Sequence, residues 1–78
     1  LPDEAERKHL IELVMGTFLT SRFNWGKILS ISDGLSQAEI GAACRDAIKE
    51  AVLHDRSKVS ATELISSLNQ RRQVYSGL

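Results

Sequence analysis

The junction over residues 33–40, Asp-Gly-Leu-Ser-Gln-Ala-Glu-Ile, most constrains how this chain can fold. Gly34 lacks a Cβ and takes the left-handed backbone conformation that closes a helix at little steric cost. Two residues later, the Ser36 hydroxyl can accept a hydrogen bond from the Glu39 amide while Glu39 bonds back to Ser36, which is the capping box of a helix start. The sequence therefore predicts that one helix ends and another begins within this junction.

Length and charge limit the classes of function. The chain has 78 residues, which suits one small domain and leaves little room for a deep catalytic cleft. Ten basic and ten acidic side chains cancel, so no net field attracts nucleic acid or an anionic membrane surface. No apolar stretch approaches the roughly 18 residues of a membrane span, and no signal-peptide pattern opens the chain. The chain begins with Leu1-Pro2 rather than Met, from which we expect a fragment of a longer chain or a processed product.

Apolar residues at helical spacing predict a first helix that ends near Leu19 or Thr20. Pro2 suits its first turn, and the acidic residues after Pro2 complement the positive end of the helix dipole. Gly16 is expected to weaken this helix by about 1 kcal/mol relative to Ala. The apolar stripe of the helix consists of Leu10, Leu13, Val14, Thr17 and Phe18.

Three further helices are predicted. Asn24 is the expected N-cap of a short helix that ends at Gly34, with an apolar face of Trp25, Ile28, Leu29 and Ile31. The next runs from Gln37 to about His54, and small residues on its buried face permit close helix approach; that face comprises Ile40, Ala43, Cys44, Ala47, Ile48, Ala51 and Val52. After an extended Val59, a second capping box, Ser60 with Glu63, begins the last helix, which carries Ala61, Leu64, Ile65 and Leu68 and frays from Arg71. The predicted fold is an all-α, compact four-helix bundle over residues 1–75, with 76–78 as a frayed tail.

The motifs of common catalytic sites are missing from the sequence. No glycine-rich turn is followed by Lys and Ser or Thr, so the chain alone has no P-loop. Cys44 and the two histidines lack the paired spacings of a zinc site, and Cys44 is expected to be a buried thiol rather than a nucleophile. A single cysteine suits a reduced, cytoplasmic compartment. We therefore expect no catalytic residue and no metal ligand.

The arginines have both a functional and a plain surface interpretation. Arg45 has poor partners along its own helix and is the arginine expected to point outward toward a partner, with a solvated surface position as the other interpretation. Arg71 and Arg72 could contact phosphate or an acidic partner, but a solvated helix end is favoured because no aromatic residues interleave with them.

Four short segments occur in an order and spacing that are specific together. They are Leu1-Pro2-Asp3-Glu4-Ala5-Glu6-Arg7, Asp33-Gly34, Leu35-Ser36-Gln37-Ala38-Glu39-Ile40 and Cys44-Arg45-Asp46-Ala47. Together they resemble the small helical lid of AAA-type ATPases, over Leu1 to about Leu68. In that family, a Leu-Pro-Asp segment with a following arginine marks the exit from the large nucleotide-binding domain. A run of glycine, an aromatic or aliphatic residue, Ser, Gly, Ala, an acidic residue and an aliphatic residue then begins the third lid helix.

The resemblance implies a lid-type four-helix bundle that closes over ATP. The ATP and its Mg are held by the preceding P-loop domain of the same parent chain. The lid also passes nucleotide state to neighbouring subunits of a homo-hexamer. The resemblance places Gly34, Ser36, Gln37 and Ala38 at the cofactor, with Gln37 and Ala38 near the adenosine. A helix start offers N–H donors, and the small Ala38 allows close approach. Gln37 stands where the family usually has glycine, so its longer side chain either adds a hydrogen bond or narrows the pocket. No arginine stands near this helix start, so no cis-acting arginine sensor is implied.

Two other classes of function stay open. A stand-alone helical adaptor that offers a groove to a partner helix fits the neutral charge and the small-residue helix, and it predicts an exposed apolar patch. A helical DNA-binding module fits the helix-turn-helix-like spacing around Gly34. It is the weakest alternative, because the segment from Gln37 to Ala43 has no base-reading side chain except Gln37. We therefore expect neither nucleic acid nor a membrane among the partners.

Overall fold

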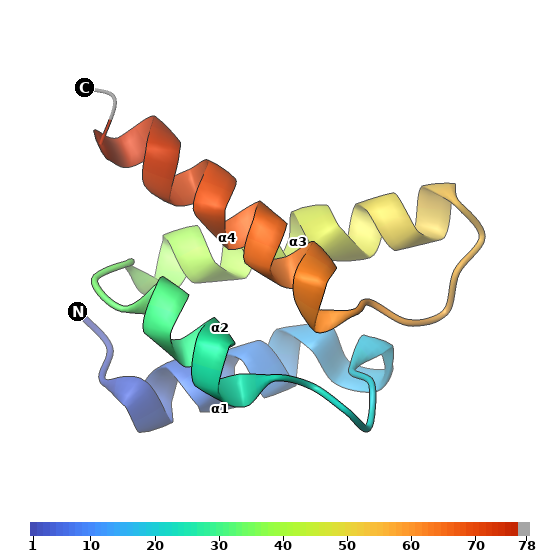
Figure 1. Ribbon diagram of the computed structural model, residues 1–78, viewed down its shortest axis with the longest axis horizontal. Helices are drawn as coiled ribbons and strands as arrows, with labels where there is room; N and C mark the ends of the chain where they lie inside the picture. Colours follow the sequence, from blue (N-terminus) through green and yellow to red (C-terminus); the bar gives the residue numbers. More distant parts are fainter. Residues whose placement is uncertain (77–78) are drawn as a thin grey trace.

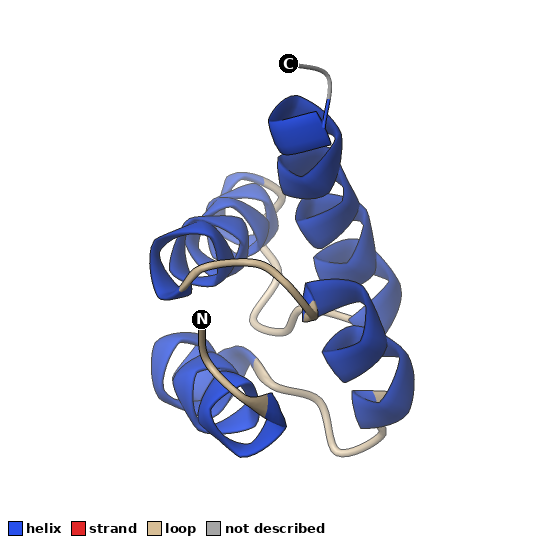
Figure 2. Cartoon of the chain, turned by 90° about the vertical axis from the view of Figure 1, so that its left-hand side faces the viewer, coloured by secondary structure: helices blue, strands red, loops and turns tan. Residues whose placement is uncertain are grey.

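The computed structural model describes residues 1–76, and it describes side chains through Gln73. The elements in this part of the chain are α1 (Glu4–Met15), the 3₁₀ turn η1 (Gly16–Phe18), α2 (Trp25–Ser32), α3 (Gln37–Leu53) and α4 (Ala61–Ser76). Helices α1 and α3 form one layer, and α2 and α4 form the other (Figures 1 and 2). Helix α3 packs against both α1 and α4, and α2 packs against α4 and α1. The predicted all-α, compact four-helix fold is confirmed.

Helix α1 begins at a cap that the sequence analysis missed, and it ends earlier than predicted. The Asp3 carboxylate accepts a hydrogen bond from the Glu6 amide at 2.8 Å, and the Glu6 carboxylate accepts one from the Asp3 amide at 2.9 Å. This complete capping box makes Asp3 the N-cap, so Pro2 precedes the helix instead of lying in its first turn. At the other end, Gly16 has a φ of 53° and ends the helix rather than merely weakening it.

The face of α1 that packs into the core differs from the predicted stripe. Ile11 and Met15 are fully buried, although neither was included in the stripe, whereas Leu13 is 66% exposed and Thr17 is exposed. The remaining members of the stripe, Leu10, Val14 and Phe18, are half-buried at the edge of the core. The predicted stripe was extended through Gly16, where the real helix stops. The predicted buried face was therefore placed too close to Leu13.

The predicted junction between α2 and α3 is largely confirmed. Asn24 caps α2 by accepting from the Lys27 amide at 3.2 Å, and Gly34 has the expected left-handed φ of 84°. Ser36 caps α3 by accepting from the Glu39 amide at 3.1 Å. The return bond from the Ser36 amide to Glu39 is not formed, so only half of the predicted capping box is present.

The buried face of α3 is confirmed except near its end. The predicted residues from Ile40 to Ala51 are buried, apart from a half-buried Ile48, but Val52 is 59% exposed. Ala51 already takes the inward position of the last turn, and Val52 is rotated about 100° from it. Cys44 is fully buried as predicted, and burial raises the pKa of its thiol to about 12 despite the lowering effect of Arg45. Cys44 is therefore a side chain of the core.

Helix α4 is capped at its start and is bonded to α3 along its length. The second capping box is confirmed, because the Ser60 hydroxyl accepts from the Glu63 amide at 3.2 Å and Glu63 accepts from the Ser60 amide at 3.0 Å. Farther along, the buried Ser67 hydroxyl donates to the Ala43 carbonyl at 2.8 Å. The predicted fraying at Arg71 is wrong, because Arg71 pairs with Asp46 of α3 at 2.7 Å and the helix continues to Ser76. Residues 77–78 of the predicted tail lie outside the described residues.

One core joins the two layers and the two long loops. Its fully buried members come from all four helices and from Val59, and include Ile11, Met15, Ile28, Ile40, Cys44, Leu64 and Leu68. Val59 is extended, as expected, and its amide donates to the Phe18 carbonyl at 2.8 Å within a single parallel bridge to Leu19. The Lys58 ammonium also donates to the Thr17 carbonyl at 2.6 Å, which fixes the α3–α4 loop against η1.

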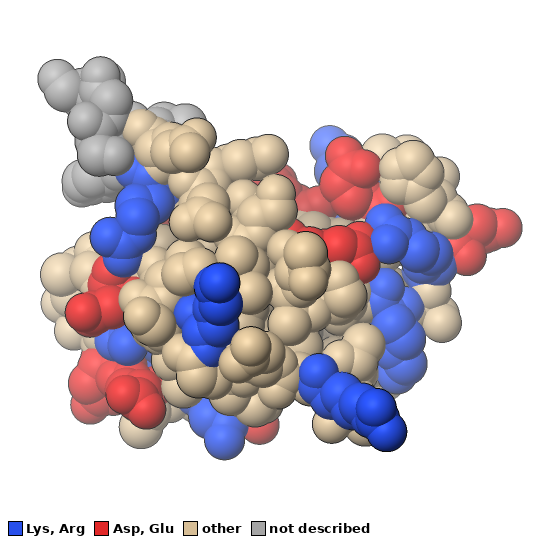
Figure 3. All heavy atoms as spheres, viewed as in Figure 1, with Lys and Arg blue, Asp and Glu red and all other residues tan. Residues whose placement is uncertain are grey.

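Acidic and basic side chains are interspersed over the face shown in Figure 3, in agreement with the balanced composition. Among the described residues, no helix has both the length and the apolar character needed to cross a bilayer.

Candidate functional site

The start of α3, where the sequence placed its candidate cofactor residues, is held rigidly by local contacts. Leu35 is buried in the core, and its amide donates to the Ser32 carbonyl at 3.1 Å. Gly34 makes the turn with its positive φ, and Ser36 is extended with φ −74° and ψ 165° before the helix begins. The chain therefore leaves α2 and enters α3 with a fixed direction.

The first turn of α3 presents two free backbone donors. The amides of Gln37 and Ala38 occupy the first two helical positions, and neither has an acceptor within the described part of the chain. The first N–H groups of a helix lack intrahelical partners and lie at the positive end of its dipole. Both side chains are exposed. This helix start can therefore donate to an acceptor atom of a ligand or of another domain.

A hollow of about 390 Å³ lies beside this helix start. It is lined by Leu1, Pro2, Glu6, Ser36 and Gln37, and in Figure 1 the N-terminus lies next to the connection between α2 and α3. Of the four predicted cofactor residues, the structure brings Ser36 and Gln37 to this hollow. Gly34, in the turn, and Ala38, exposed on the first turn of α3, do not line it.

The chemistry of the hollow favours an uncharged group. Leu1 and Pro2 provide an apolar wall, while the Glu6 carboxylate, which also accepts from the Asp3 amide, contributes a negative charge. That charge repels a phosphate but not a heterocycle or a sugar hydroxyl. The volume is at the low end of the roughly 300–1,000 Å³ of small-molecule sites, so it suits part of a nucleotide rather than the whole.

Leu1, Pro2 and Glu6 line the hollow but were not among the residues predicted for the site. No local pattern could have placed them there, because these residues are far from Ser36 in the chain and meet it only through the packing of the N-terminal segment. The family resemblance was the one available signal, since it includes the segment from Leu1 to Arg7 among its four matching segments.

The other polar candidates are placed as follows. Arg45 is exposed as expected and folds back along α3, because its Nη1 lies 3.2 Å from the position that a Cβ on Gly41 would take. His9 is exposed, and His54 forms an ion pair with Glu50 at 3.4 Å on the surface. The described residues contain no group of three or more side chains that could hold a metal ion.

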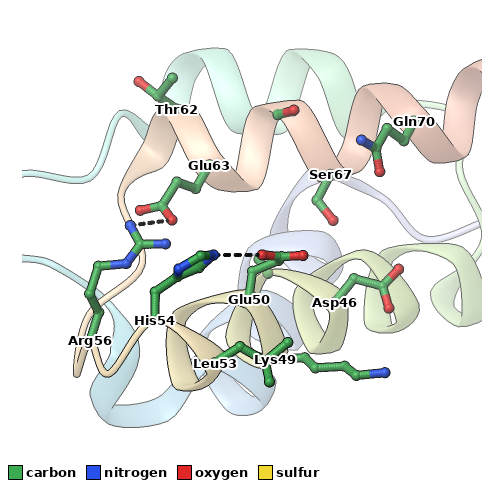
Figure 4. Close-up of a pocket in the computed structure, with 12 residues that line it drawn as sticks. Asp46, Lys49, Glu50, Leu53, His54, Arg56, Thr62, Glu63, Ser67 and Gln70 are labelled. Atoms are coloured by element: carbon green, nitrogen blue, oxygen red, sulfur yellow. Dashed lines mark ion pairs between the residues drawn. The ribbon is translucent and has the colours of Figure 1, made fainter.

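A larger groove of about 740 Å³ separates the last turns of α3 from the first turns of α4 (Figure 4). Two ion pairs line this groove, one between Arg56 and Glu63 at 2.6 Å and one between His54 and Glu50. Leu53 lines it while remaining 69% exposed. Its walls combine charged and small polar side chains, with no unpaired acid–base arrangement that resembles a catalytic centre.

Comparison of the chain with protein-family models and with curated proteins finds no match.

Proposed function

We propose that this chain is the helical lid of an AAA-type ATPase, which helps to close the ATP site of a preceding P-loop domain. The observation that carries the proposal is the hollow where Leu1 and Pro2 meet Ser36 and Gln37. In a lid, the segment around Pro2 connects to the large domain and the start of α3 approaches the nucleotide. The structure has these two segments side by side, which supports the family resemblance of the sequence.

The hollow also supports a site in which the lid contacts the adenosine and the P-loop domain contacts the phosphates. The apolar wall of the hollow, the Glu6 carboxylate and the free amide of Gln37 suit the adenosine. The Glu6 carboxylate disfavours the phosphates here, so the P-loop domain would hold the phosphates together with their Mg. The proposal also includes that the lid couples nucleotide state to the neighbouring subunits of a homo-hexamer and that the protein is cytoplasmic. The chain is not catalytic by itself.

The test begins with the coding sequence upstream of Leu1, read over roughly 200 residues for a glycine-rich loop ending in Lys-Ser or Lys-Thr. The extended protein is then compared with its Ala38→Leu variant in an ATPase assay. The family resemblance implies that Ala38 lies near the adenosine. Added bulk there removes binding that ground state and transition state share, so we expect a raised KM for ATP with little change in kcat.

Thr62→Leu is the matched control. Thr62 is exposed at the second position of α4, whose start has the same Ser-x-x-Glu pattern as that of α3, and it lies away from the hollow. We expect its KM to equal that of the parent protein. Absence of a P-loop upstream, or an unchanged KM in the Ala38→Leu variant, would refute the lid proposal.

The adaptor alternative is favoured by one observation, the groove between α3 and α4. Leu53 is exposed at this groove, and Val52 beside it in the sequence is exposed as well, so the end of α3 offers apolar area to a partner helix. An unrelated domain upstream of Leu1, combined with loss of partner capture in a Leu53→Asp variant, would favour this function over the lid.

A further inference from the structure

Arg7 is a buried arginine that joins three segments of the chain. Its side chain is on α1, yet only 6% of the residue is exposed. Nε donates to the Ser32 hydroxyl at 3.1 Å, Nη2 donates to the Leu29 carbonyl at 3.0 Å, and Nη1 donates to the Pro2 carbonyl at 3.1 Å. Nη1 also lies 3.6 Å from the exposed Asp33 carboxylate. We call this set of contacts the Arg7 clasp.

Part of the clasp stabilises the end of α2. The last carbonyls of a helix have no intrahelical donor and carry partial negative charge, which a guanidinium satisfies. Ser32 is fully buried and donates its hydroxyl proton to Leu29, so the accepting groups around Arg7 are themselves ordered. These bonds explain why an arginine can be buried here, since each guanidinium nitrogen has a partner.

The bond to the Pro2 carbonyl has a different consequence. Pro2 precedes the N-cap Asp3, so this bond contributes nothing to the ladder of either helix. It fixes the path of the N-terminal segment across the end of α2. Because Pro2 also lines the hollow beside Ser36 and Gln37, the same bond sets the position of one wall of the candidate site.

A second arginine binds the same helix end from α4, which lies in the same layer as α2 (Figure 2). Arg72 of α4 donates to the Ile31 carbonyl at 2.9 Å and to the Asp33 carbonyl. Its described contacts are thus with the end of α2, whereas Arg7 contacts both that end and Pro2. Variants of Arg7 and Arg72 can therefore distinguish two effects. Loss of either arginine weakens the end of α2, but only loss of Arg7 releases the described bond to Pro2.

We propose that Arg7 is a positioning residue that locks the segment Leu1–Pro2 against the end of α2 and thereby sets the distance of this segment from the start of α3. Lysine cannot replace it, because one ammonium group cannot donate in the three fixed directions of the guanidinium fork. The consequence for function rests on the proposed lid. There, the locked segment is the connection to the large domain, and Arg7 fixes the direction in which that domain meets the nucleotide side of the lid.

The experiment measures the proximity of the two segments in this chain without nucleotide. A nitroxide is attached at Gln37→Cys, an exposed position, while the buried Cys44 stays unlabelled. The paramagnetic broadening of the Leu1 methyl NMR signals is then compared in four backgrounds: the parent protein and its Arg7→Met, Arg7→Lys and Arg72→Met variants. The Asp3 amide, which the Asp3–Glu6 cap holds in place, is the reference signal. Circular dichroism checks that each variant keeps its helix content.

We expect the parent and Arg72→Met to lose most of the Leu1 signal intensity to the nitroxide. We expect Arg7→Met and Arg7→Lys to recover it while the Asp3 signal stays the same in all four backgrounds. Unchanged broadening in Arg7→Met would overturn the proposal, as would equal recovery in Arg72→Met, since Arg7 would then only stabilise α2. Unfolding of both Arg7 variants would also count against a specific positioning role. The result is independent of the lid proposal, because neither ATP nor an upstream domain enters the measurement.

Discussion

Gly34 offers a direct test of why the α2–α3 junction has its shape. Its φ is 84°, and a Cβ added there would meet no atom within 4 Å. Replacement by Ala therefore has no steric effect on neighbouring side chains, and the whole cost lies in the backbone. The left-handed conformation costs an L-residue about 1–2 kcal/mol, and the smaller entropy of the unfolded Ala chain offsets about 0.4–1 kcal/mol. We expect Gly34→Ala to destabilise the protein by about 1 kcal/mol, from the difference between these two terms.

Gly41→Ala is the matched control, since Gly41 lies inside α3 with ordinary helical geometry. A Cβ there would come within 3.2 Å of the Arg45 Nη1, which is the end of a flexible, exposed side chain that can move aside. Helix propensity favours Ala over Gly by about 0.8–1.0 kcal/mol. The same substitution is thus expected to stabilise the protein by up to about 1 kcal/mol at position 41.

Urea unfolding followed by circular dichroism measures both variants. For a domain of this size, 1 kcal/mol corresponds to a shift of about 4–8 °C in Tm, so thermal scans provide a second measurement. Opposite signs at the two positions are the essential result. A neutral or stabilising Gly34→Ala would show that the left-handed turn is not required, and the explanation of the junction given above would fail.

Three further predictions concern the cap of α4, the buried thiol and the core. Hydrogen bonding from the Ser60 amide is the main cause that lowers the pKa of Glu63 below 4.5. The ionised carboxylate therefore stabilises the fold above that pH, and this contribution is lost as the pH falls through the lowered pKa. In urea titrations across pH, Glu63→Gln should be less stable than the parent at neutral pH and equal to it in acid. Cys44 should react with a thiol reagent only on unfolding, measured with and without urea, because it is buried with a pKa of about 12. Leu64→Ala should cost about 2–5 kcal/mol, whereas Leu53→Ala at an exposed position should stay within about 0.5 kcal/mol in the same urea assay.

Each of these predictions has a result that would contradict it. A constant difference between the Glu63→Gln variant and the parent from neutral to acid pH would show that the carboxylate charge is irrelevant to the cap. Rapid modification of Cys44 in the folded protein would place its thiol outside the core. Equal losses for Leu64→Ala and Leu53→Ala would mean that the two positions do not differ in burial.

The helix boundaries set by nearby residues could be predicted from the sequence. The Asn24 and Ser36 caps and the Ser60–Glu63 box each join groups three residues apart, so a short window contains both partners. Gly34 could be assigned because a tight turn needs a positive φ that few other residues adopt. The Asp3–Glu6 box has the same spacing, and it was missed only because Pro2 was taken as part of the helix.

The direction of α1 could not be predicted in the same way. Apolar side chains occupy several faces of its second half, so 3.6-residue periodicity does not select one face by itself. Packing against α3 selected Ile11 and Met15 and left Leu13 in solvent. Similarly, the apolar Val52 was included in the predicted buried face of α3, and only the position of the neighbouring helices shows that it faces outward.

The sequence by itself determined that the chain is all-α, where most of its helices start, and that a rigid turn leads into α3. The tertiary structure alone decided that Leu1 and Pro2 meet Ser36 and Gln37, and that Arg7 holds Pro2 against the end of α2. The physical reason is the range of the forces involved. Caps and turns satisfy backbone groups within one helical turn, whereas the hollow and the Arg7 clasp join groups that become neighbours only after the helices have packed.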